Sequence, residues 1–97
     1  MPRAQRQIQA LGERLRAARM RRQMTQGELA ARVGVSVPTV GKLERGDPAT
    51  SLSTMLRVLT ALRLDQDIDL LARSDELGRE LQDSRLRRPA ARRGSAP

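Results

Sequence analysis

Hydrophobic residues recur at helical spacing along most of the chain, and short polar or glycine-containing segments separate the resulting apolar faces. The first face follows residues 1–6, which have no periodic pattern and are expected to form a flexible N-terminus. Intervals of three and four residues then predict a helix from about Ile8 to Arg22, with arginines on its other faces. Its apolar residues are Ile8, Leu11, Leu15 and Ala18, and Met20 and Met24 are expected to fill the core at its end.

Residues 25–46 contain the clearest local signals and predict two short helices joined by a tight turn. Thr25 is suited to cap the first helix, and Glu28, three residues later, completes a capping box. Leu29, Ala30 and Val33 follow as an apolar face. Gly34 then ends the helix, because the closing turn favours a left-handed conformation that glycine adopts without penalty.

The second short helix is predicted to start after Ser36 as its cap, with Pro38 in the first turn, where its missing N–H is not needed. Val40 and Leu43 face inward, and the Gly46-Asp-Pro segment ends the helix. Two helices around a glycine turn form a helix-turn-helix, whose second helix lies in the major groove of DNA. The alternative is an αα-hairpin in an unrelated helical bundle.

Downstream, a broad apolar stripe predicts a fourth helix that opens at residues 50–53 and closes the core. Its members are Leu52, Met55, Leu56, Leu59 and Leu62. Residues 65–72 then predict a short fifth helix capped by Asp65. Its apolar residues Ile68, Leu70 and Leu71 are expected to serve partly the core and partly a dimer contact.

The C-terminal quarter of the chain has weaker signals. Residues 73–86 predict a marginal sixth helix, with Leu77 and Leu81 on a narrow stripe that contacts a partner or a second copy. Residues 87–97 have nothing to bury and are expected to form a disordered basic tail, either solvated or in contact with phosphates. The DNA-binding domain would then cover residues 7–72.

The charge of the chain favours a polyanionic partner, because the formal net charge is +8 and the isoelectric point is about 11.7. The arginines gather in the first helix and near the C-terminus: Arg14, Arg16, Arg19, Arg21 and Arg22, then Arg85, Arg87, Arg88, Arg92 and Arg93. Between them, the segment from Asp65 to Asp83 is acidic. This segregation predicts a second surface for a different partner.

Several function classes are disfavoured by composition, because the chain has no His, Cys, Phe, Tyr or Trp. Without His or Cys, the usual general base and thiol nucleophile are missing, so we expect neither an enzyme nor any catalytic residue. Asp65, Asp67 and Asp69 do not match a calcium loop, which needs a central glycine and a terminal glutamate, so no metal or cofactor is expected. No apolar run reaches membrane-spanning length, and the lack of cysteine agrees with a cytoplasmic protein.

The run Thr25-Gln-x-Glu-Leu-Ala-x-x-Val-Gly-Val-Ser-x-x-Thr-Val-x-x-Leu-Glu-Arg-Gly46 resembles the Xre/Cro-type helix-turn-helix of phage and bacterial repressors. The resemblance is tight over residues 25–46 and looser over about 11–72. It implies an all-α fold, a compact five-helix lambda-repressor-like DNA-binding bundle with a possible short sixth helix. It also implies a buried salt bridge between Arg19 and Glu44, for which a solvated arginine is the alternative.

Two sets of DNA contacts follow. Phosphate contacts are expected from Gln26, which the resemblance implies, and from Ser36, Thr39, Arg45 and Arg22. Base contacts are expected from the outward residues of the second helix, Val37, Pro38, Gly41 and Lys42. This set can read few bases directly, because Lys42 is its one strong donor, so DNA shape should contribute to specificity. We hypothesise that Gly41 lets the backbone approach DNA closely.

Residues 46–90 are similar, less specifically, to HipB-like antitoxins. In that group a homodimeric repressor neutralises a HipA-type serine/threonine kinase toxin and represses their shared operon. The resemblance implies operator DNA, a second copy and such a kinase as partners. The alternatives are a stand-alone Xre-family transcriptional regulator and a protein-interaction adaptor on a degenerate helix-turn-helix. An RNA-binding module is disfavoured because the chain has no aromatic stacking residue.

Overall fold

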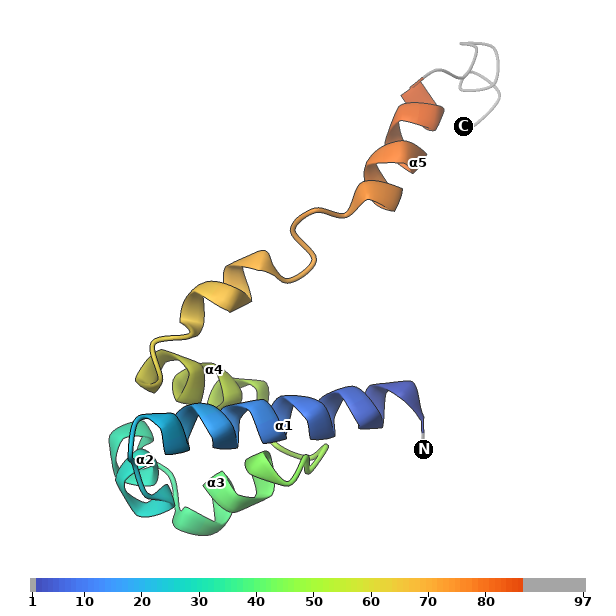
Figure 1. Ribbon diagram of the computed structural model, residues 1–97. Coiled ribbons are helices and arrows are strands. Elements are labelled where there is room, and N and C mark those ends of the chain that lie inside the picture. Colours follow the sequence, from blue (N-terminus) through green and yellow to red (C-terminus); the bar gives the residue numbers. More distant parts are fainter. Residues whose placement is uncertain (1, 87–97) are drawn as a thin grey trace.

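Residues 2–86 are described by the structure, a computed structural model, and six helices run along them in sequence (Figure 1). They are α1 (Arg3–Arg21), α2 (Gln26–Val33), α3 (Val37–Glu44), α4 (Leu52–Ala61), the 3₁₀-helix η1 (Asp65–Leu70) and α5 (Glu76–Leu86). Within these residues there is no strand, which confirms the predicted all-α fold with a sixth helix. Met1 and the predicted tail at residues 87–97 lie outside the described residues.

The turn between α2 and α3 is fixed by local interactions that the sequence predicts. Thr25 and Glu28 form the capping box, with hydrogen bonds of 3.0 and 3.1 Å between side chains and backbone N–H groups. Gly34 has a φ of 82°, and its N–H donates to the Ala30 carbonyl over 2.8 Å. Ser36 then caps α3. Because glycine takes this φ without strain, α3 can start two residues after the turn.

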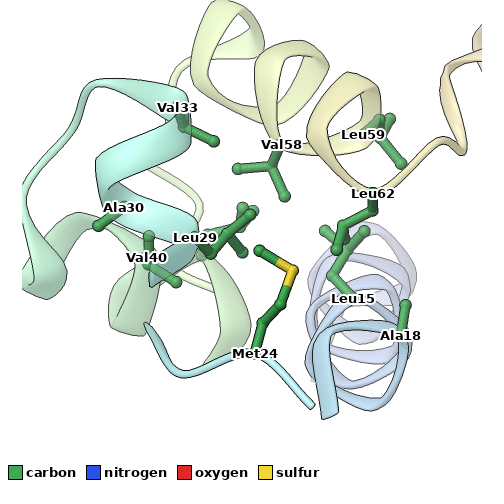
Figure 2. Close-up of a cluster of buried hydrophobic side chains, with 11 residues drawn as sticks. Leu15, Ala18, Met24, Leu29, Ala30, Val33, Val40, Val58, Leu59 and Leu62 are labelled. Atoms are coloured by element: carbon green, nitrogen blue, oxygen red, sulfur yellow. The ribbon is translucent and has the colours of Figure 1, made fainter. Parts of the chain in front are cut away.

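An aliphatic core lies between α1, α2, α3 and α4. Figure 2 shows Leu15, Met24, Leu29, Val58 and Leu62 converging in its centre. The buried hydrophobic residues are Leu15, Ala18, Met24, Leu29, Ala30, Val33, Val40, Leu43, Val58, Leu59 and Leu62. Burying one leucine side chain stabilises a fold by roughly 1.5–3 kcal/mol, so a core without aromatic residues can still hold these short helices together.

The buried face of α4 differs from the predicted one. Leu52, expected in the core, is 66% exposed, and Thr54 and Val58, which were not expected there, are buried. The helix is rotated about its axis relative to the predicted orientation. Residues 54 and 58 of α4 and the C-cap residue 62 are buried at intervals of four, whereas Leu52 in the first turn is exposed.

The first helix begins earlier than predicted, at Arg3 rather than near Ile8, so residues 3–6 are helical. Polar contacts explain the extension: the Gln5 side-chain amide donates to the Gly46 carbonyl over 3.0 Å. Further along, Gly12 brings α1 against the end of α3. A Cβ at Gly12 would lie only 2.6 Å from the carbonyl oxygens of Leu43 and Glu44. This approach has no periodic signature in the sequence.

Beyond α4 the chain leaves the core. η1 replaces the predicted fifth helix, and the predicted cap at Asp65 is wrong, because Leu64 occupies the cap position and makes no side-chain hydrogen bond there. Ile68 packs against the core, whereas Leu70 and Leu71 are 61% and 67% exposed. α5 has no buried residue and extends away from the bundle (Figure 1), which gives the described chain a longest dimension of 63 Å.

Candidate nucleic-acid interface

The outer face of α3 is open to solvent, as a recognition helix requires. Val40 and Leu43 are buried on its inner side, and Val37, Pro38 and Lys42 are exposed. At 100° per residue, positions 38, 42 and 45 lie opposite the buried ones. Of the predicted base-contacting residues, Pro38 and Lys42 therefore lie on the accessible side of the helix, and Val37 is exposed at its edge in the first turn.

A buried network joins α1, α2 and α3 behind this face. The Arg19 guanidinium donates two hydrogen bonds to the Glu44 carboxylate, from Nε to Oε2 over 2.7 Å and from Nη2 to Oε1 over 3.0 Å. Its Nη1 donates to the Met24 carbonyl over 2.8 Å. Both side chains are buried. The structure therefore contains the pair that the resemblance implied, and it excludes a solvated Arg19.

The same network sets the ionisation of its members. Burial alone raises the pKa of Glu44, but hydrogen bonds from Arg19 and Gln26 and the positive charges of Arg19 and Arg16 outweigh it, so the pKa lies below its usual value. The hydrogen bond with Glu44 holds the pKa of Arg19 above its usual value. The pair is therefore fully charged at neutral pH, and its bidentate geometry fixes the angle between α1 and α3.

Gln26 is the third member of this network. Its Nε2 donates to Glu44 Oε1 over 3.0 Å, which holds the half-buried side chain at the start of α2. A primary amide has a second N–H hydrogen that can donate elsewhere. Glu44 thus positions the side chain predicted to contact phosphate, and the orientation is set before any DNA binds.

The first turn of α3 places two hydroxyl groups together. The Thr39 N–H donates to Ser36 Oγ over 3.3 Å, and the two hydroxyl oxygens lie 2.8 Å apart. Ser36 is exposed and Thr39 half-buried. Both predicted phosphate contacts therefore stand at the positive end of α3, where backbone N–H groups favour an anion.

Gly41 does not present its own surface, because the Arg45 side chain covers it. Gly41 is buried although it lies on the outer half of α3, and a Cβ there would be 3.0 Å from Arg45 Nη1. Side chains of a helix lean toward its N-terminus, so a long residue at 45 reaches back over position 41. The structure thus places the Arg45 guanidinium in front of the helix face rather than beside it.

Arg22 is placed less favourably for DNA. Its Nη1 donates to the Ala18 carbonyl over 2.8 Å, so the side chain folds back over the end of α1. A recess of about 210 Å³ between α3 and the following loop was not predicted from the sequence. Thr39, Lys42, Asp47, Ala49, Thr50 and Ser51 line it. The one signal was the Asp47-Pro48 turn, in which Asp47 Oδ1 accepts from the Ala49 N–H over 2.8 Å.

The residues predicted for a dimer or partner contact lie apart from α3. Leu70, Leu71, Leu77 and Leu81 are all exposed, and they belong to η1, α5 and their connection. In Figure 1 α5 and α3 are at opposite ends of the molecule. The chain therefore presents two separate candidate surfaces, one basic and one apolar with acidic residues.

Residues 2–86 were also searched for membrane-spanning helices and for metal sites. No helix among residues 2–86 combines the length and the apolar character needed to cross a membrane. In the same part of the chain, no cluster of three or more His, Cys, Asp or Glu side chains is arranged to hold a metal ion.

Comparison with known proteins identifies the architecture. No curated protein sequence matches the chain at a significant level. A family model described as a helix-turn-helix domain matches residues 10–71, which run from within α1 to just past the end of η1 and include the whole of the Arg19–Glu44–Gln26 network. Since this match covers more than half of the sequence, the chain belongs to the helix-turn-helix domain family.

Proposed function

We propose that this helix-turn-helix protein is a sequence-specific transcriptional repressor that binds operator DNA as a homodimer. The observation that carries the proposal is the outer face of α3, where Lys42 and Arg45 project from a helix whose inner side is locked to α1 through Arg19 and Glu44. The net charge of +8 supports a polyanionic partner. In a two-fold dimer, two copies of α3 would enter major grooves about one helical turn apart.

Phosphate contacts would come from Gln26, Ser36, Thr39 and, after release from the end of α1, Arg22. Lys42 would contact a base edge, and Val37 would meet a thymine methyl group. Pro38 and Gly41 offer no donor. Pro38 keeps the first turn of α3 free of a long side chain, and Gly41 leaves room for the side chain of Arg45.

For Arg45 we propose a different DNA contact from the one expected from the sequence. At the end of α3 it was expected to contact phosphate, but its guanidinium lies over Gly41, which was among the residues expected to face the bases. A guanidinium is suited to bind guanine O6 and N7 through two hydrogen bonds. We therefore assign Arg45 to base readout, with Gly41 providing the space that its side chain occupies.

Binding to the DNA upstream of the protein's own gene, compared with a scrambled duplex and a single strand, tests this function. We expect tight, salt-dependent binding to one duplex site and weak binding to the other two. For Arg45→Ala, base readout predicts a loss of about 1–3 kcal/mol on the operator and little on the scrambled duplex. An equal loss on both duplexes, with a shallower salt dependence, would return Arg45 to phosphate contact.

Gly41→Ala tests the position of the Arg45 side chain over Gly41 with a smaller change than Arg45→Ala. The added Cβ would lie 3.0 Å from Arg45 Nη1, so the guanidinium must shift to accommodate it. We expect weaker operator binding with unchanged binding to the scrambled duplex. Operator affinity equal to that of the native protein would contradict the proposed role of Arg45 in base readout.

A second candidate function is that of a HipB-like antitoxin, which represses its operon and neutralises a HipA-type kinase. The exposed leucines of residues 70–81, set among the acidic residues of the 65–83 segment, favour it, because DNA binding makes no use of them. Co-purification of the tagged protein with the product of the neighbouring gene tests this candidate. A stable complex that still protects the promoter supports an antitoxin, and promoter binding without a partner supports a stand-alone regulator.

A further inference from the structure

We propose that α5 of each copy packs into a groove between α1, α4 and η1 of a second copy, so that two chains exchange their C-terminal helices. This inference rests on the proposed homodimer and names the surfaces that form it. The argument has three parts: α5 has no partner within the chain, a groove of matching character is open, and the charges on the two surfaces fit each other.

α5 is an amphipathic helix without a packing partner. Leu77 and Leu81, one turn apart, are 67% and 56% exposed, and no α5 residue is buried. Glu76, Glu80 and Asp83 lie along the adjoining side, whereas Arg85 flanks the leucines on the other. An isolated helix of 11 residues is marginal in water, so a stable α5 requires a surface to cover its leucines.

A groove of about 420 Å³ lies between α1 and the segment formed by α4 and η1. Its floor is apolar and includes Leu11, Leu15, Leu59 and Leu64. Arg14 and Arg21 line it from α1, and Asp67 lines it from η1. No α3 residue contributes to the groove, so a helix bound there leaves the DNA-facing side free.

The two surfaces match in charge and in spacing. Arg14 and Arg21 are seven residues apart on α1, as Glu76 and Asp83 are on α5. Seven helical residues span about 10.5 Å in either helix, so the two pairs can meet when the helices lie side by side. With Leu77 and Leu81 on the groove floor, the acidic side of α5 faces the arginines, and Arg85 lies on the flank that faces Asp67.

The connection before α5 favours a second copy over the chain's own groove. Ala72 adopts a φ of 59°, and Asp75 caps the helix through a hydrogen bond of 3.1 Å to the Gly78 N–H. Arg79 Nη2 donates to the Arg73 carbonyl over 3.4 Å. These interactions hold α5 pointing away from the core (Figure 1). In a two-fold exchange each copy gives one helix and one groove, so both helices and both grooves are covered.

Charge reversal on the full chain, with the mass measured by sedimentation equilibrium, tests the exchange. The native protein should have twice the chain mass of 10.8 kDa. Arg14→Glu/Arg21→Glu, and separately Glu76→Arg/Asp83→Arg, should each shift the mass toward 10.8 kDa, because like charges then face each other. Arg3→Glu/Arg32→Glu, which changes the net charge as much as the first pair but outside the groove, should remain dimeric.

Mixing the two reversed variants gives the decisive result. In a mixed dimer the native α5 meets a native groove and the reversed α5 meets a reversed groove, so both contacts are restored and the dimer mass should return. A native monomer, reversed variants that stay dimeric, or a mixture that stays monomeric would each overturn the exchange. Circular dichroism confirms that each variant is folded. Binding of a half-site duplex by the native chain tests DNA recognition separately, so either idea can fail alone.

Discussion

Two helical segments of the described chain, α4 with its C-cap and α5, contain leucines at helical spacing, with opposite results. Leu59 and Leu62 of the first are 5% and 0% exposed, whereas Leu77 and Leu81 of α5 are 67% and 56% exposed. The periodic pattern therefore indicates an apolar face but not what covers it. The charges on the rest of the helix separate the two cases: α4 has only Arg57, and α5 has five charged residues among eleven.

The two parts of the described chain therefore differ in what covers their apolar residues. The α1–α4 core fixes the direction of α3 with buried contacts, so its precision depends on packing and on one ion pair. The C-terminal helix exposes its apolar face, and its removal should leave the core intact. Changes in the core should therefore alter stability, and matched changes in α5 should alter association.

The largest effect is expected when the buried ion pair is broken. Arg19→Met leaves Glu44 buried without its charge partner, which costs roughly 3–5 kcal/mol of unfolding free energy. Thermal unfolding followed by circular dichroism measures it. Arg19→Met/Glu44→Leu should be less destabilised than the single variant, because no unpaired buried charge remains. A single variant that loses under 1 kcal/mol would show that the core does not depend on this pair.

Matched leucine truncations come next and test the comparison directly. Leu62→Ala removes a fully buried side chain and should cost roughly 2–5 kcal/mol, because the lost contacts leave a cavity. Leu81→Ala should leave the chemical unfolding midpoint of the monomer unchanged and weaken only self-association. Equal destabilisation by the two variants at concentrations where the protein is monomeric would mean that α5 packs on its own core.

A smaller effect is expected at the contact of α1 with α3. Gly12→Ala would place a Cβ 2.6 Å from two backbone oxygens, so the helices must separate, at a cost of typically 1–3 kcal/mol. Gly27→Ala is the matched control in α2, since its Cβ would meet only Thr25 Oγ1 at 3.7 Å. Higher helix propensity should make the control neutral or stabilising. Urea unfolding separates the two, and identical midpoints would refute the close contact.

The parts of this structure that sequence predicts are those set by neighbours in the chain. The capping box at Thr25, the turn at Gly34 and the cap at Ser36 each depend on residues within four positions, and all three were predicted. The Arg19–Glu44 pair joins residues 25 positions apart and was anticipated only through family resemblance. The close approach at Gly12 was missed because it has no local signal.

The candidate interface shows the same division. The exposed positions of α3 follow from helical periodicity, so Val37, Pro38 and Lys42 were placed correctly on its outer side. The position of Arg45 over Gly41 depends on the direction in which a long side chain leans, which a list of outward positions does not contain. The rotation of α4 that exposes Leu52 depends on its contact with α2 in the same way.

The smallest effect concerns acid stability and again belongs to the core. Hydrogen bonds and charges outweigh burial to hold the pKa of Glu44 below its usual value, and hydrogen bonds with Thr25 lower the pKa of Glu28. A carboxylate with a lowered folded-state pKa contributes stability above its unfolded pKa of about 4.3, and this contribution is lost as the pH falls through the folded value.

Urea midpoints measured at pH 7 and near pH 3 should therefore decrease in the native protein. They should decrease less in Glu44→Gln, which starts from a lower midpoint because the charge facing Arg19 is already lost. Glu13→Gln in α1 is the matched control and should follow the native protein, because that side chain is exposed and lies outside both the buried network and the groove. A native protein and a Glu44→Gln variant with equal acid dependence would show that the buried pair does not couple folding of the core to pH.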